Sequence, residues 1–105
     1  MERLMADSEQ AEKQYHAASS VDLLSALSAL DIEFLTVSDQ RVLIIYARSI
    51  LNVDVNTGDI QSADALEVTV LDHDPSGGIN DPYGLITRVI DQIDEMAGGN
   101  LSPVP

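Results

Sequence analysis

Asp72, His73 and Asp74 place an imidazole between two carboxylates, just before a loop that contains Gly77 and Gly78. Such groups could bind a divalent cation, and His73 could transfer a proton with a carboxylate beside it. A metal site needs several ligands that converge from one side, which three consecutive residues seldom do. We interpret the triplet as the solvated end of a strand, and we predict no metal site, no cofactor and no catalytic residue.

The segment DVNTGD at residues 54–59 is superficially similar to the start of a calcium-binding loop. Such a loop has glycine in its sixth position and glutamate in its twelfth, whereas here Gly58 is fifth and Ala65 is twelfth. We predict a hairpin turn in which Gly58 has a positive φ angle. The chain contains no cysteine, and no serine has a base at a telling spacing, so we do not expect an enzyme.

Charge is the strongest signal in the composition. The 105 residues include 18 acidic and five basic side chains, for a formal net charge of −13. From Asp54 onward there are ten acidic residues and one basic residue, Arg88, so this half carries −9 of the total. Such a surface repels the phosphates of nucleic acids and attracts basic proteins. Acidity can also serve only solubility, or reflect a salt-loving source.

Residues 41–48 contain six consecutive apolar residues between Arg41 and Arg48. This pattern predicts a central strand that is buried on both faces. A strand over residues 32–37 should pair with it through the short link at residues 38–40. Alternation predicts a half-exposed strand over 51–55, with Leu51, Val53 and Val55 inward, and a fourth strand over 66–70.

Two helices are expected to cover the sheet. Ser19 and Asp22 indicate a helix start, with helix from about Ser20 to Leu30. The second helix begins at Asp81 and Pro82 and ends at Gly98. The fold prediction is a small two-layer α+β domain over residues 19–98, in the order α-β-β-β-β-α. Residues 1–18 would form an arm or an optional short helix from about residue 8, and 99–105 a tail.

The predicted function is a non-enzymatic acidic protein-binding module, such as an inhibitor, adaptor or chaperone-like regulator, that engages a basic protein. One alternative is a nucleic-acid mimic that inhibits a DNA- or RNA-binding complex, such as a phage-encoded anti-restriction or anti-CRISPR protein. Another is a small structural component of a viral or other assembly. No motif assigns the chain to a family. The predicted partner-binding residues are Asp72, Asp74, Asp81, Asp91, Asp94 and Glu95.

The sequence also predicts the localisation and the oligomeric state of the protein. No apolar run reaches the roughly 18 residues of a membrane span, and the N-terminus lacks the apolar centre of a signal peptide. We expect a soluble, cytoplasmic protein with no direct contact to membranes or nucleic acid. A strand with two apolar faces in a two-layer domain leaves one face bare, which predicts a possible homodimer through the exposed sheet.

Overall fold

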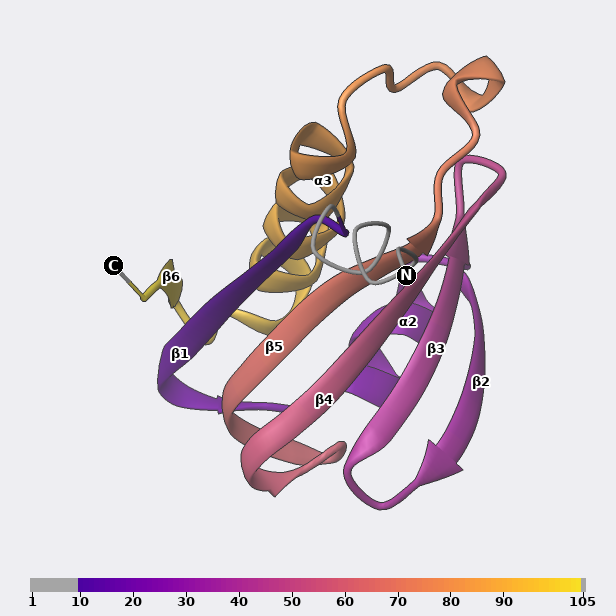
Figure 1. Ribbon diagram of the computed structural model, residues 1–105. Coiled ribbons are helices and arrows are strands. Elements are labelled where there is room, and N and C mark those ends of the chain that lie inside the picture. The colour runs from indigo at the N-terminus through magenta and orange to yellow at the C-terminus, as the bar shows by residue number, and fades with distance from the viewer. Residues whose placement is uncertain (1–9, 105) are drawn as a thin grey trace, which may run out of the picture.

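An antiparallel sheet of six strands forms the framework of the protein in the computed structural model, which describes residues 10–104 (Figure 1). The elements are β1 Glu12–Val21, α2 Leu23–Ala29, β2 Glu33–Ser38, β3 Arg41–Tyr46, β4 Ser49–Asp59, β5 Ser62–Asp72, the 3-10 turn η1 Pro75–Gly77, α3 Pro82–Ala97 and β6 Leu101–Pro103. The spatial order is β2–β3–β4–β5–β1–β6. The predicted α+β class is confirmed.

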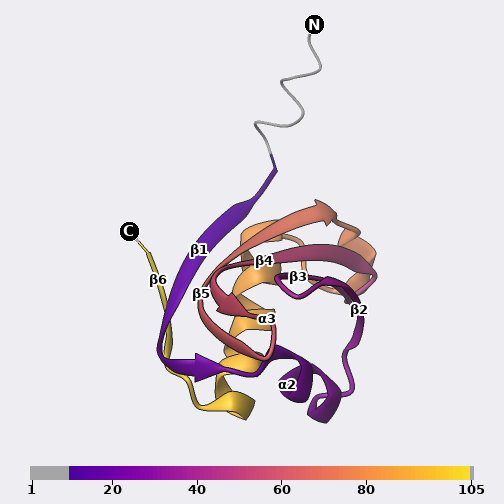
Figure 2. The same ribbon diagram turned by 90° about the horizontal axis from the view of Figure 1, so that it is seen from below.

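Consecutive hairpins build the sheet from β2 to β5, as the sequence predicted. Directly opposite residues in an antiparallel sheet lie on the same face, and the register places Val42, Val53 and Val68 in one row. This face is covered by α2 and α3, which both lie on the same side of the sheet (Figure 2). We call the opposite side the open face. The strand residues buried under the helices include Val42, Ile44, Leu51, Val53, Val55, Leu66, Val68 and Val70.

The helix α3 begins and ends where the sequence predicted. The Asp81 carboxylate accepts a hydrogen bond from the backbone N–H of Tyr83 at 3.1 Å, and Pro82 occupies the first turn. Gly98 ends the helix with a φ angle of 72°. One stripe of the helix is buried against the sheet, consisting of Leu85, Ile86, Val89, Ile90 and Ile93.

The first predicted helix is present but shorter than expected. It was expected from Ser20 to Leu30, and α2 covers Leu23–Ala29. Its N-cap is Asp22 and not Ser19, because the Asp22 carboxylate accepts hydrogen bonds from the backbone N–H and the hydroxyl of Ser25, at 3.1 and 2.8 Å. The capping acid was correctly located, but its position relative to the helix was wrong.

The predicted count of four strands and the predicted order were wrong, because both terminal segments contribute strands. The short helix expected from about residue 8 lies partly outside the described residues, and from Glu12 the chain forms β1, with Tyr15 opposite Leu66 of β5. The expected tail at 99–105 includes β6, which pairs with β1 through Leu101 opposite Ala17. The first strand therefore precedes the first helix, and β1 lies between β5 and β6.

The strand β3 is not the centre of the sheet, and it is buried on one face only. Val42 and Ile44 are fully buried under the helices, whereas Ile45 on the open face is 39% exposed. The central positions belong to β4 and β5. The half-exposed prediction for β4 was also too simple, because Asn52 on the open face is buried at 4% exposure by its neighbours.

The hairpin between β4 and β5 turns later than the sequence indicated. The strand β4 continues through Gly58 to Asp59, and the turn lies at Ile60 and Gln61. Gly58 has the predicted positive φ angle, 93°, but it lies at an irregularity in the β4–β5 register. It is therefore a bulge residue within the ladder.

Candidate functional site

The second half of α3 carries three carboxylates within five residues, at Asp91, Asp94 and Glu95. Burial of the apolar stripe turns the opposite side of the helix outward, and four exposed residues at a spacing of four form what we call the α3 ridge: Tyr83, Thr87, Asp91 and Glu95. Asp94 lies beside this ridge and is partly buried. The structure thus brings together three of the six predicted partner-binding residues.

The position of these carboxylates opposes the helix dipole. Asp94 and Glu95 lie in the last turn of α3, where the partial charge of the helix is negative and cations are favoured, and Asp91 lies one turn earlier. The last turn contains no basic residue. Within residues 10–104, the ion pairs are Arg41–Asp54 and Arg48–Asp74, so none involves an α3 carboxylate. Asp91 and Glu95 are also like charges at i and i+4, which repel each other.

Asp94 differs from its two neighbours because it has a structural contact. Its carboxylate accepts a hydrogen bond from the backbone N–H of Leu101 at 3.0 Å, and its carbonyl accepts one from the N–H of Gly98 at 2.7 Å. These contacts turn the chain from the end of α3 into β6. Asp94 therefore has a role in the fold whether or not it contacts a partner.

The acids of the loop before α3 are likewise used within the fold. Asp74 caps η1 through the backbone N–H of Ser76 at 2.9 Å and lies 3.3 Å from Nε of Arg48. The hydrogen bonds from Ser76 lower the pKa of Asp74, and Arg48 contributes in the same direction. Asp81 caps α3. A partner-binding role for either remains a prediction.

The triplet at residues 72–74 does not converge on one point. Asp72 is exposed and lies opposite Ile50, which places it in a row of the open face. The His73 Nε2 lies 2.7 Å from the carbonyl oxygen of Ile79, which can only accept, so this nitrogen donates and ties the loop together. Asp74 points to η1. The six predicted residues consequently lie on separate parts of the surface: the open face, the loop and α3.

The open face is divided into an apolar and a polar part, which sequence reasoning missed. The apolar part lies on β2 and β3, where Leu35 and Ile45 are 60% and 39% exposed. On β4, the Asn52 amide accepts a hydrogen bond from Arg41 Nε at 2.6 Å and donates one to Asp54 at 2.8 Å. The apolar residues within 35–45 could have indicated the apolar part of this face. No feature of the sequence indicated that β2 would be an edge strand.

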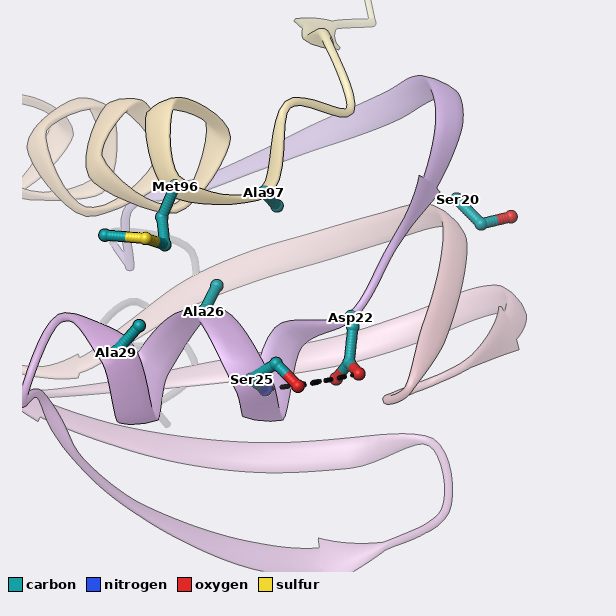
Figure 3. Close-up of a pocket in the computed structure, with 7 residues that line it drawn as sticks. All are labelled: Ser20, Asp22, Ser25, Ala26, Ala29, Met96 and Ala97. Carbon is teal, nitrogen blue, oxygen red and sulfur yellow. Dashed lines mark hydrogen bonds between the residues drawn. The ribbon is translucent and has the colours of Figure 1, made fainter.

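The groove between α2 and α3 contains few polar side chains. Figure 3 shows a groove between α2 and the last turn of α3, and its only carboxylate, Asp22, is engaged by Ser25. Ser20 at its margin donates to Asp64 at 2.5 Å. The remaining lining residues are Ser25, Ala26, Ala29, Met96 and Ala97. The hydroxyl–carboxylate pair among these lining residues, Ser25 and Asp22, forms the N-cap of α2.

Tyr15 beneath the α3 ridge provides a pH-dependent test of the site. Burial raises the pKa of Tyr15 above 10.0, the negative charge of Asp91 raises it further, and a hydrogen bond with Thr87 lowers it in part. Because the pKa of Tyr15 is higher in the folded than in the unfolded chain, its contribution to the free energy of unfolding is fully present below about pH 10. That contribution is lost as the pH rises further, since Tyr15 ionises first in the unfolded chain.

We expect Tyr15→Phe to flatten this loss between about pH 9 and about pH 11, measured as the urea midpoint at each pH. Tyr83→Phe is the matched control, because Tyr83 is 49% exposed. Equal pH profiles for the two variants would show that Tyr15 is not the group responsible. Asp91→Asn should bring the absorbance titration of Tyr15 to lower pH.

Within residues 10–104, no helix has the length and the apolar composition needed to cross a membrane. Comparison with known proteins finds no match for this chain among protein-family models, curated protein sequences or solved structures.

Proposed function

We propose that the protein is a non-enzymatic binding module, an inhibitor, adaptor or chaperone-like regulator, whose α3 ridge engages a basic surface of another protein. The observation that supports this function is the placement of Asp91 and Glu95. Both are exposed, and neither has an ion-pair partner among the described residues. Glu95 lies in the last turn of α3, where the dipole disfavours a carboxylate, and Asp91 lies one turn earlier, where it repels Glu95.

This placement costs folding free energy, and no ion pair within residues 10–104 offsets that cost. A carboxylate near a helix C-terminus is unfavourable by about 0.3 to 1 kcal/mol, and a like-charge pair at i and i+4 by about 0.2 to 0.5 kcal/mol. Lysine or arginine at these positions would stabilise the helix. A basic partner supplies the missing cations, and the net charge of −13 would steer such a partner toward the protein.

The proposal predicts that binding and stability change in opposite directions. In the double variant Asp91→Asn/Glu95→Gln, relief of the unfavourable charges should raise the free energy of unfolding by up to about 1 kcal/mol. Loss of two exposed ion pairs with the partner should weaken binding by about two- to thirtyfold. The measurements are urea denaturation and calorimetric titration with the partner recovered by affinity purification from the native host.

A variant with the same charge change elsewhere is the control. Asp31→Asn/Asp39→Asn also removes two negative charges, at exposed positions on either side of β2. It should leave affinity within about twofold, because distant exposed charges are largely screened at physiological salt. Equal weakening by both double variants would mean that net charge, and not the α3 ridge, determines binding.

A further inference from the structure

Among residues 10–104, no strand pairs with the outer side of β2, so this strand is an edge of the sheet (Figure 1). It contains neither lysine nor proline, which commonly prevent pairing at an exposed edge. Leu35 and Val37 are 60% and 49% exposed. The irregularity in the β2–β3 register lies between Thr36 and Ser38, so the strand is regular from Glu33 to Thr36. The opposite edge, β6, has three residues and includes Pro103.

Stacking of two open faces, the dimer that the sequence suggested, does not suit this surface. Exposed apolar residues lie on β2 and β3 and at Leu71 near the end of β5, whereas the middle of β4 and β5 places Asn52, Asp54 and Glu67 on the open face. A stacked dimer would bury the hydrogen-bonded Arg41–Asn52–Asp54 cluster and several carboxylates. Desolvation of those charges opposes such an interface.

We propose instead that a second copy of this chain pairs with β2 along its edge, antiparallel, about a two-fold axis that passes at Leu35. The two sheets then form one continuous sheet, with the helices of both copies on the same side. Leu35 lies beside Leu35 of the second copy, and Leu43, which is opposite Leu35 within each copy, extends the apolar strip on both sides. Such pairing is self-complementary, as a two-fold interface requires.

This register brings one acid and one base of opposite copies near each other. With the axis at Leu35, Glu33 lies opposite Val37 of the second copy, which is next to the row of Arg41. The distance from Glu33 to that row is about two strand spacings, or roughly 10 Å, which long side chains can span. Asp31 and Asp39 lie in the turns that flank β2, outside the paired stretch. Each copy therefore offers an acid at one end of β2 and a base near the other, since the contacts of Arg41 with Asn52 and Asp54 use its Nε atom.

The association should be weak and should strengthen with salt. A six-residue strand is about 20 Å long, and its edge contact falls below the roughly 800 Å² per partner of a standard interface, so we expect a dissociation constant of about 10 µM to 1 mM. Two copies with a net charge of −13 repel each other, and salt screens that repulsion. Binding of a basic partner to the α3 ridge should instead weaken with salt. The proposed dimer and the proposed function can therefore be tested separately.

Disulfide trapping tests the register directly, because the chain has no cysteine of its own. Directly opposite residues in an antiparallel pair have Cα atoms about 4.5 to 5.5 Å apart, within the range of a disulfide. The full chain with Leu35→Cys should form a covalent dimer at least about tenfold faster than the chain with Leu71→Cys. Leu71 is a matched control, since it is 43% exposed and lies on β5.

Leu35→Lys gives the second measurement, because it places two ammonium groups against each other on the axis without disturbing a buried residue. Sedimentation should show a monomer–dimer equilibrium for the natural chain and for Leu71→Lys, and monomer only for Leu35→Lys. Equal disulfide rates at residues 35 and 71, a natural chain that stays monomeric up to about 1 mM, or a Leu35→Lys dimer would each overturn the proposal. If the natural chain is monomeric and Leu35→Lys abolishes its binding to a basic partner, the edge of β2 would be the binding site of that partner and not of a second copy.

Discussion

Truncation of Ile93 to alanine is expected to lower the free energy of unfolding by about 2 to 5 kcal/mol. Ile93 is fully buried in the stripe of α3 that packs on the sheet, together with Ile86 and Ile90. Removal of its side chain loses the transfer free energy of three carbons and leaves a cavity that the sheet cannot fill. The measurement is the urea midpoint, which reports the change in stability if the m-value is the same for both proteins.

Met96→Ala is the control for this prediction. Met96 is on the same helix, one turn closer to the end, and is 47% exposed, so its truncation should change stability by less than about 0.5 kcal/mol. If the two variants lost equal stability, the buried stripe would not be the contact that holds α3 on the sheet.

Replacement of Gly58 by alanine should lower stability by about 2 kcal/mol or more. Gly58 has a φ angle of 93°, which costs an L-residue about 1 to 2 kcal/mol, and a Cβ atom there would lie 2.1 Å from the carbonyl oxygen of Ser62. That oxygen belongs to the backbone of β5 and cannot move without opening the hairpin. The effect is read from thermal or urea unfolding.

Gly78→Ala separates the two causes of this loss. Gly78 has a similar φ angle of 102°, but nothing lies within 4 Å of an added Cβ atom. It should therefore lose only the conformational part, about 1 to 2 kcal/mol. A loss at Gly58 no larger than the loss at Gly78 would show that the bulge in β4 is free to open.

The elements that the sequence predicted well are those whose signals are local. The start of α3 was visible in Asp81 and Pro82 and its end in Gly98, and all three residues have the predicted role. The hairpins from β2 to β5 were predicted by alternation and by their polar links, although the last turn came at Ile60 and Gln61. Each of these signals depends on neighbours in the sequence.

The two terminal strands had no comparable signal. Residues 12–18 consist mainly of helix-forming Glu, Lys, Gln and Ala, and tertiary pairing with β5 overrides that preference. The inward alternation there rests on Ala11 and Tyr15, and an alanine contributes little to an apolar pattern. For β6, the prolines indicated a tail, and the bond from Leu101 to Asp94 joins residues that the sequence does not associate.

The candidate site was predictable in its charge but not in its arrangement. The apolar stripe defines the opposite face of α3, and Asp91 and Glu95 lie exposed on that face, whereas Asp94 is partly buried beside it. The internal roles of Asp74 and Asp94 depend on η1 and β6, which could not be inferred from the pattern. The exposed edge at β2 follows from the insertion of β1 on the other side of the sheet, which is a property of topology alone.

The most direct test of the proposed function is the salt dependence of binding between the natural chain and the partner recovered from its host. The dissociation constant would be measured by calorimetry at about 50 mM and about 500 mM salt, over which the screening length falls from about 14 Å to about 4 Å. Recognition through Asp91 and Glu95 predicts that affinity falls at least about tenfold. An affinity that is unchanged across this range would contradict it.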